Sequence, residues 1–213
     1  MEWGVAAVAL KGESESGDRC VVQPFPGGIL LAVIDGLGHG IEASSAAASA
    51  ESVLRAQPQE PVISLVRRCH ERLRSTRGVV MSVVSFDTSH GLMTWLGVGN
   101  VRGTLRRFMP SSFPSREELL LRAGVIGRQI PPLQAAVLTV SPGDTLFLAS
   151  DGIKGEFAQE RTPLEAPQIL AEVILTKYAK TNDDAVVLVA RVLGNRNERS
   201  GGKIEEQSAS GAC

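Results

Sequence analysis

The order of apolar segments in this 213-residue sequence predicts an α+β fold, with antiparallel sheet at the centre and helices outside. Three strand-like segments come first, two helical segments follow together, and a series of strand-like segments then leads to a late helix and a final strand. This order differs from the regular strand-helix alternation of parallel α/β proteins. The length suits one domain with a substantial core, which we expect to occupy residues 1–193.

The first half of the chain contains three expected strands and two expected helices. Residues 2–10, 20–25 and 28–34 have the length and composition of strands. The third of them, GILLAVI, is apolar throughout, which predicts a strand covered on both faces. Residues 41–56 are good helix formers without Gly or Pro, and apolar residues recur at helical spacing over about 61–75.

In the second half the pattern returns to strands. The expected strands are 79–86, 92–98, 101–109, 118–123, 136–140, 145–149 and, after a helix over about 165–179, 185–193. Asp87–Gly91 and Gly97–Asn100 have the composition of hairpin loops. Residues 194–213 are polar, rich in Gly and Ser and without periodicity, so we expect a disordered tail.

Composition and charge argue against several classes of protein. The formal net charge of −1 provides no overall field for nucleic acid or an anionic membrane, so neither is expected as a partner. The first residues lack the basic start and long apolar segment of a signal peptide, and the longest apolar runs have only strand length. The three cysteines form no metal-ligand or redox motif. A cytoplasmic location is the simplest expectation.

Aspartates recur beside the apolar runs that we expect to be strands. The residues with this placement are Asp18, Asp35, Asp151, Asp183 and Asp184. A single Asp-Gly pair is usually a turn. Several carboxylates brought together by strand ends are unfavourable unless a cation neutralises them, and oxygen ligands at fixed positions suit Mg²⁺ or Mn²⁺. The glycines that follow Asp35 and Asp151 allow a sharp turn and can expose a carbonyl to the same ion. The pattern predicts a metal site.

Four short motifs, SGD at 16–18, DGLGHG at 35–40, SDGI at 150–153 and NDDAVVLV at 182–189, resemble the ordered motifs of the PPM-type metal-dependent protein phosphatases. The DGLGHG form is similar to that of the bacterial sporulation stage II E branch. The resemblance covers roughly residues 3–193. It implies a central antiparallel β-sandwich flanked by helix pairs, in four αββα layers, with the motifs at one edge. A catalytic domain of this size without further domains is similar to the stressosome feedback phosphatases.

The resemblance also implies a role for each acidic position around two divalent cations, Mn²⁺ or Mg²⁺. Asp35 is expected to bridge both ions, and the carbonyl of Gly36 to bind the second. Asp151 and Asp183 are expected to complete the shell of the first ion, and Asp18 to hold water on the second.

The two adjacent aspartates at the last strand leave one ambiguity. Aligning NDDAV with the family pattern makes Asp183 the direct ligand and Asp184 its neighbour. A slip of one residue exchanges these two roles.

The implied reaction is hydrolysis of phosphoserine or phosphothreonine on a bacterial signalling protein, by direct attack of a metal-activated water. STAS-domain proteins of a stressosome are the implied substrates. Two alternatives stay open: a non-catalytic binding module of the same fold, and a hydrolase of small phosphoesters. The complete set of acidic positions argues against the first, and the lack of a Gly-rich nucleotide fingerprint argues against the second.

Two positions depart from the pattern of better-known relatives. Those relatives carry a His directly after the first Asp-Gly, where this chain has Leu37. The nearest imidazole, His39, either donates a proton to the leaving group or packs or caps near the start of the helix at Ile41. Asn100 stands where some relatives have the Asp of a third metal site, so we expect no tightly bound third ion.

Overall fold

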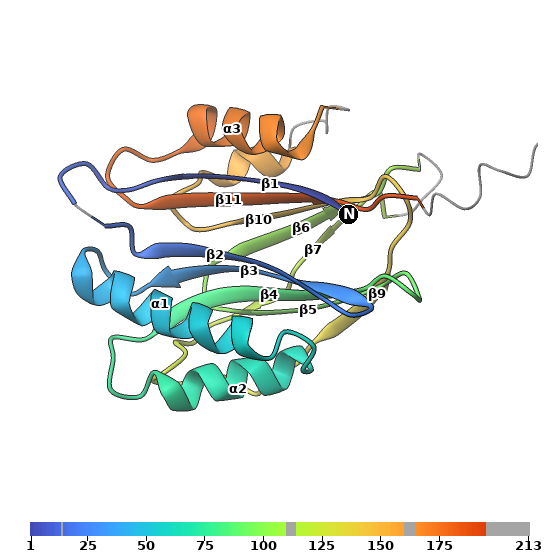
Figure 1. Cartoon of the computed structure of the whole chain (residues 1–213). Coiled ribbons are helices and arrows are strands. Elements are labelled where there is room, and N and C mark those ends of the chain that lie inside the picture. The colour runs from blue at the N-terminus through green and yellow to red at the C-terminus, as the bar shows by residue number, and fades with distance from the viewer. Residues whose placement is uncertain (14, 110–113, 160–164, 195–213) are drawn as a thin grey trace, which may run out of the picture.

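The computed structural model describes residues 1–13, 15–109, 114–159 and 165–194. Two β-sheets are stacked face to face, with helices on both outer faces (Figure 1). The helices α1 and α2 cover one sheet, and α3 covers the other. This arrangement confirms the predicted α+β class and its αββα layers.

The first sheet has the strand order β1-β11-β10-β6-β7 and is antiparallel throughout. Its strands are β1 (Glu2–Val8), β11 (Ala185–Arg191), β10 (Thr145–Ala149), β6 (Arg102–Arg106) and β7 (Arg116–Glu118). The second sheet has the order β2-β3-β4-β5-β8, and β9 also pairs with β5. Its strands are β2 (Asp18–Phe25), β3 (Gly28–Gly36), β4 (Val79–Asp87), β5 (Leu92–Val98), β8 (Leu121–Arg122) and β9 (Ala136–Thr139). Only the short β5–β8 pairing is parallel among these described strands.

The helices cover the two sheets unequally. The second sheet carries the antiparallel pair α1 (Ile41–Ala56) and α2 (Val62–Arg72). The first carries α3 (Pro167–Tyr178) together with the short 3₁₀ turn η1 (Gly155–Gln159), so the expectation of a full helix pair on each face is wrong for this face of the described chain. None of these helices has the length and apolar character needed to cross a membrane.

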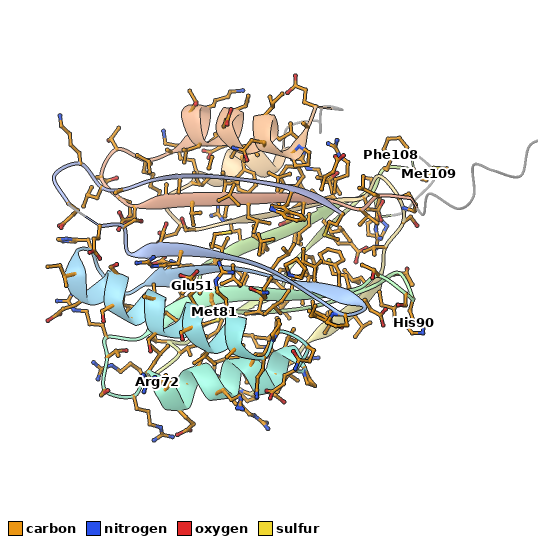
Figure 2. The ribbon with its side chains drawn as sticks, in the orientation of Figure 1. Glu51, Arg72, Met81, His90, Phe108 and Met109 are labelled. Atoms are coloured by element: carbon orange, nitrogen blue, oxygen red, sulfur yellow. The ribbon has the colours of Figure 1, made fainter. Side chains whose placement is uncertain are left out.

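The strand β3 shows how the sequence builds the core. Its side chains alternate between two clusters, because successive residues of a strand point to opposite faces. Leu30 and Ile34 pack under α1 and α2, while Leu31 and Val33 fill the space between the sheets. All four are fully buried, which confirms that this apolar segment is covered on both faces. Figure 2 shows the side chains that fill the layers, including Met81 of β4 on the helix side.

Two local predictions are wrong, for the same reason. The expected strand 118–123 is two short strands, β7 and β8, which pair in different sheets. The expected hairpin at Gly97–Asn100 instead takes the chain from β5 in one sheet to β6 in the other. Turn composition shows where a strand stops but does not say which sheet the next strand joins. The predicted tail, 194–213, lies outside the described residues except for Gly194.

Candidate metal centre

The sheets bring the predicted aspartates together in two pairs. Asp18 opens β2 and Asp35 lies near the end of β3, and the antiparallel register places these two residues directly opposite each other. Asp151 follows the end of β10, and Asp183 precedes the start of the adjacent antiparallel strand β11. The first pair belongs to one sheet and the second pair to the other. Stacking of the sheets therefore gathers carboxylates from distant parts of the chain at one edge of the sandwich.

Electrostatics show that these carboxylates interact with one another. Burial, assisted by repulsion from Asp18, Asp151 and Asp183, raises the pKa of Asp35 to about 8. Burial also raises the pKa of Asp18 to about 7, although a hydrogen bond from Ser150 opposes the shift. The pKa of Asp183 is raised as well, by burial and then by Asp151. A cation bound at this edge would offset the repulsion between the carboxylates.

Asp184 has a different environment from its neighbour Asp183. It is only 4% exposed, and its two carboxylate oxygens accept hydrogen bonds from the backbone amides of Leu10 and Gly17, at 2.8 Å each. Asp184 thereby ties the start of β11 to both ends of the loop between β1 and β2. Asp183 is half-buried.

Ser150 is a site residue that the sequence reasoning missed as a functional position. Its hydroxyl donates to Oδ2 of Asp18 at 2.6 Å and accepts from the backbone amide of Val186 at 3.0 Å. It thus links β10 and β11 of one sheet to β2 of the other. The signal was its place directly before Asp151 in the SDGI motif, where a small hydroxyl can reach a carboxylate of the other sheet.

Asn100 takes part in the site through a hydrogen bond to a carboxylate. Its side-chain amide donates to Oδ2 of Asp151 at 2.7 Å. The segment that carries Asn100 runs between the sheets instead of forming a hairpin, and this course brings the amide to Asp151. A neutral donor here fixes one oxygen of Asp151 without adding negative charge to the cluster.

Two glycines of the motifs allow unusually close backbone contacts. A Cβ atom on Gly36 would lie 2.3 Å from the carbonyl oxygen of Ala43 in α1. A Cβ atom on Gly152 would lie 1.8 Å from the carbonyl oxygen of Asp184. Both distances are far below van der Waals contact, so only glycine fits at either position. The Gly after Asp35 and the Gly after Asp151 are therefore required by packing.

The structure contradicts one of the two roles predicted for His39, that of packing or capping near the start of α1. Its Nδ1 is 2.6 Å from Oε1 of Glu13, and 64% of its side chain is exposed. The residue at the N-cap of α1 is Gly40, without a side-chain capping bond. His39 therefore neither caps α1 nor packs into the core.

The donor set fits a hard divalent cation. The side chains gathered at this edge offer carboxylate oxygens, which are ligands that Mg²⁺ and Mn²⁺ prefer. No three His, Cys, Asp or Glu side chains of the described residues form a ready-made metal cage. Ions such as Mg²⁺ keep several water ligands.

Comparison with known proteins agrees with this geometry. The sequence profile of Stage II sporulation protein E (SpoIIE) matches residues 26–193, most of the chain. The chain belongs to this family. One similar solved structure comes from a study of the bacterial stressosome as a modular system adapted to control secondary messenger signalling. It is 31% identical in sequence, with a TM-score of 0.80, and the match covers 89% of this chain and 98% of that one.

Two relatives carry the name RsbX. Phosphoserine phosphatase RsbX of Bacillus subtilis (strain 168) is 25% identical over 143 residues, which are 67% of this chain and 70% of the relative. A crystal structure of RsbX in complex with magnesium is 21% identical, with a TM-score of 0.78 over 87% of this chain and 92% of that one. The predicted family, fold and enzyme class are thereby confirmed: this SpoIIE-family chain is a serine/threonine phosphatase of the PPM type.

Proposed function

We propose that this SpoIIE-family chain hydrolyses phosphoserine or phosphothreonine on a signalling protein, with two divalent cations, Mg²⁺ or Mn²⁺, bound between the sheets. The observation that carries the proposal is the meeting of Asp18 and Asp35 of one sheet with Asp151 and Asp183 of the other. Cations bound there supply a nucleophile from water at neutral pH and neutralise charge on the phosphoryl oxygens.

The residues of the chain divide into ligands and positioning groups in this proposal. Asp35, Asp151 and Asp183 are the catalytic carboxylates, Gly36 contributes its carbonyl, and Asp18 holds water. Gly36 pairs with Val79 in the sheet and packs closely against Ala43 of α1, and both contacts restrain its backbone.

Hydrogen bonds hold two of these carboxylates in place. Ser150 restrains one oxygen of Asp18, and Asn100 restrains one oxygen of Asp151. Fixed carboxylates lose little entropy when an ion binds, which favours a defined coordination geometry.

We assign the direct contact with the cation to Asp183 and a structural role to Asp184. Both oxygens of Asp184 are engaged by backbone amides, and those bonds would be lost if the side chain turned toward an ion. Asp183 is more exposed and experiences the charge of Asp151 directly.

The proposed substrates are phosphorylated STAS-domain proteins of a stressosome-like complex. The support is the similarity to RsbX and to the stressosome structure. We also place the protein in the cytoplasm, where such signalling proteins act. The free thiols of Cys20 and Cys69 are compatible with a reducing compartment.

A single comparative assay tests the reaction and its two alternatives. Purified protein with Mn²⁺ or Mg²⁺ is expected to release phosphate from a serine-phosphorylated STAS-domain protein and from p-nitrophenyl phosphate, and to stop when EDTA is added. Phosphate release from small esters alone indicates a small phosphoester hydrolase. Release from neither substrate indicates a binding module.

His39 is proposed to assist the departure of the serine alkoxide by donating a proton. His39→Gln is expected to lower kcat on the phosphoprotein about tenfold and to leave turnover of p-nitrophenyl phosphate nearly unchanged, because p-nitrophenolate leaves without a proton. The matched control is His90→Gln. His90 is also exposed and paired with a carboxylate, Asp87, but lies at the far end of β4. Equal losses on both substrates would contradict a role as proton donor.

A further inference from the structure

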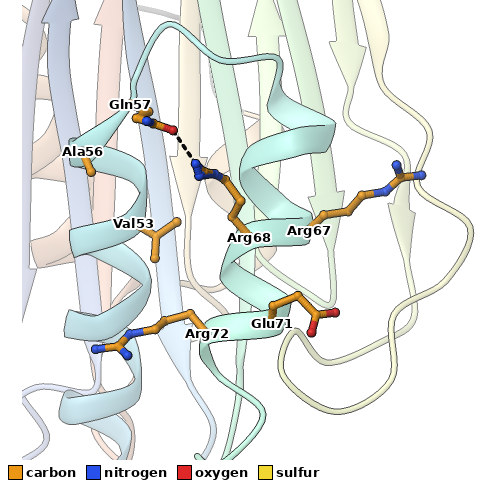
Figure 3. A pocket seen from close by; sticks show the side chains of 7 residues that line it. All are labelled: Val53, Ala56, Gln57, Arg67, Arg68, Glu71 and Arg72. Carbon is orange, nitrogen blue, oxygen red and sulfur yellow. Dashed lines mark hydrogen bonds between the residues drawn. The ribbon is translucent and has the colours of Figure 1, made fainter.

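The outer face of the α1–α2 pair contains an open groove away from the metal centre. The groove has a volume of about 730 Å³ and lies between the last turns of α1 and the second half of α2 (Figure 3). Val53 and Ala56 of α1 give it an apolar floor, and Arg68 and Arg72 of α2 project toward α1 along its side. Nothing in the proposed reaction uses this groove.

The groove carries more positive than negative charge, because three of its lining residues are arginines and one, Glu71, is acidic. Residues 55–77 carry six arginines and two glutamates, although the whole chain has a net charge of −1. The remaining residues are therefore acidic overall. The excess of positive charge lies from the last turn of α1 to Arg77, whereas the earlier turns of α1 carry Glu42 and Glu51. A localised field of one sign attracts a partner surface of the other sign.

Two of these arginines are available to a partner. Arg68 is held by Gln57 at 2.6 Å and by Glu60 at 3.3 Å. Arg67 and Arg72 are exposed and have no ion pair among the described residues. Arginine beside an apolar floor is typical of binding hot spots, because the guanidinium gives directed hydrogen bonds to carboxylates.

The chain that follows α2 leads from the groove toward the DGLGHG loop and carries two further arginines, both of which are in ion pairs. Beyond α2 the chain carries Arg74 and Arg77, and it then enters β4, whose first residue pairs with Gly36. Arg77 forms an ion pair with Glu42 and lies beside Gly38, where a Cβ atom would be 2.8 Å from the guanidinium. Arg77 therefore connects the segment after α2 to the DGLGHG loop.

We propose that the groove is a docking site for an acidic amphipathic segment of the phosphoprotein substrate. Its apolar side chains contact Val53 and Ala56, and its carboxylates pair with Arg67 and Arg72. This inference rests on the proposed function for the identity of the partner. Docking outside the cleft raises the affinity for the whole protein and has no effect on small esters, because it acts on binding alone.

A binding experiment tests the groove independently of catalysis. The probe is a fluorescein-labelled 20-residue peptide with Leu at helical i, i+4 spacing and Glu at the other positions, measured by anisotropy in low and physiological salt. We expect binding that weakens as salt is added. We expect Arg67→Glu/Arg72→Glu to weaken it at least tenfold and Ala56→Trp, which fills the groove, to weaken it as well.

Matched controls separate the groove from general charge effects. Arg116→Glu/Arg128→Glu makes the same change of net charge on exposed residues outside the groove and is expected to leave binding unchanged. A peptide with Ser in place of Leu is expected to bind at least tenfold more weakly. The proposal is overturned if wild type does not bind the probe, or if the groove and control variants bind it alike.

Kinetics then connect the groove to the substrate. On a serine-phosphorylated STAS-domain protein, Arg67→Glu/Arg72→Glu is expected to raise KM at least tenfold with kcat within twofold of wild type. Turnover of p-nitrophenyl phosphate is expected to stay the same. An unchanged KM overturns the docking role, whereas the absence of any turnover by wild type contradicts the proposed function and leaves the peptide result to judge the groove.

Discussion

Replacement of Asp35 by Asn is expected to reduce phosphatase activity by at least about 1,000-fold, which corresponds to about 4 kcal/mol of transition-state stabilisation. Asp35 lies opposite Asp18 and faces both aspartates of the other sheet, so its carboxylate is the proposed bridge between the ions. The amide is a weaker ligand and carries no charge. The measurement is metal-dependent phosphate release from p-nitrophenyl phosphate. The control is Asp87→Asn, at a partly exposed aspartate at the opposite end of β4 from Gly36.

The same substitution is expected to stabilise the metal-free protein. The raised pKa values of Asp35 and Asp18, about 8 and about 7, mean that the folded chain binds more protons than the unfolded chain above pH 4. The free energy of unfolding without metal therefore falls as the pH rises from about 4 to about 8. Asp35→Asn removes one of the interacting charges, so its Tm in EDTA at pH 8 is expected to exceed that of wild type by roughly 5 °C.

Thermal unfolding at several pH values measures this effect. Wild type in EDTA is expected to lose stability between pH 5 and pH 8, and Asp35→Asn to show a flatter dependence. Added Mg²⁺ or Mn²⁺ is expected to raise the Tm of wild type more at pH 8 than at pH 5, because ligand carboxylates must be ionised. A metal-free protein whose stability increases over this range would show that the carboxylates do not repel one another in solution.

Replacement by Asn is expected to lower mainly the activity at Asp183 and mainly the stability at Asp184. Asp183→Asn is expected to lower activity at least about 100-fold with little change in Tm, because the side chain is a proposed ligand at the cleft surface. Asp184→Asn places an amide donor opposite one of two backbone donors, those of Leu10 and Gly17. We expect a loss of about 2–3 kcal/mol of stability from this buried mismatch.

Denaturant unfolding in EDTA and activity under saturating Mn²⁺ separate the two effects. Activity of Asp184→Asn, measured well below its Tm, is expected to stay within about tenfold of wild type, as for loss of a group that positions others. If Asp184→Asn is instead stable and inactive, Asp184 is the direct ligand and Asp183 its structural neighbour. The alignment of NDDAV with the family pattern is then shifted by one residue.

Local sequence patterns were sufficient to predict most of the helices and strands. The helix at 41–56 and the strand at 145–149 have the predicted bounds, because an uninterrupted run of helix formers and a short apolar run between polar residues each favour one conformation. The strand at 28–34 was predicted to be covered on both faces, and its alternating buried side chains confirm this. The short strands β7 and β8 were merged into one, since only their pairing partners distinguish them.

The sequence by itself determined the family, the class of fold and the aspartates beside strand ends, because motif spacing and hydrophobic periodicity are properties of neighbouring residues. Only the tertiary structure decided which groups meet across the two sheets: Ser150 with Asp18, Asn100 with Asp151, and Asp184 with the amides of the β1–β2 loop. The arginine groove is likewise a product of two helices lying side by side. Contacts between residues far apart in the chain depend on strand register and sheet stacking, which no local pattern encodes.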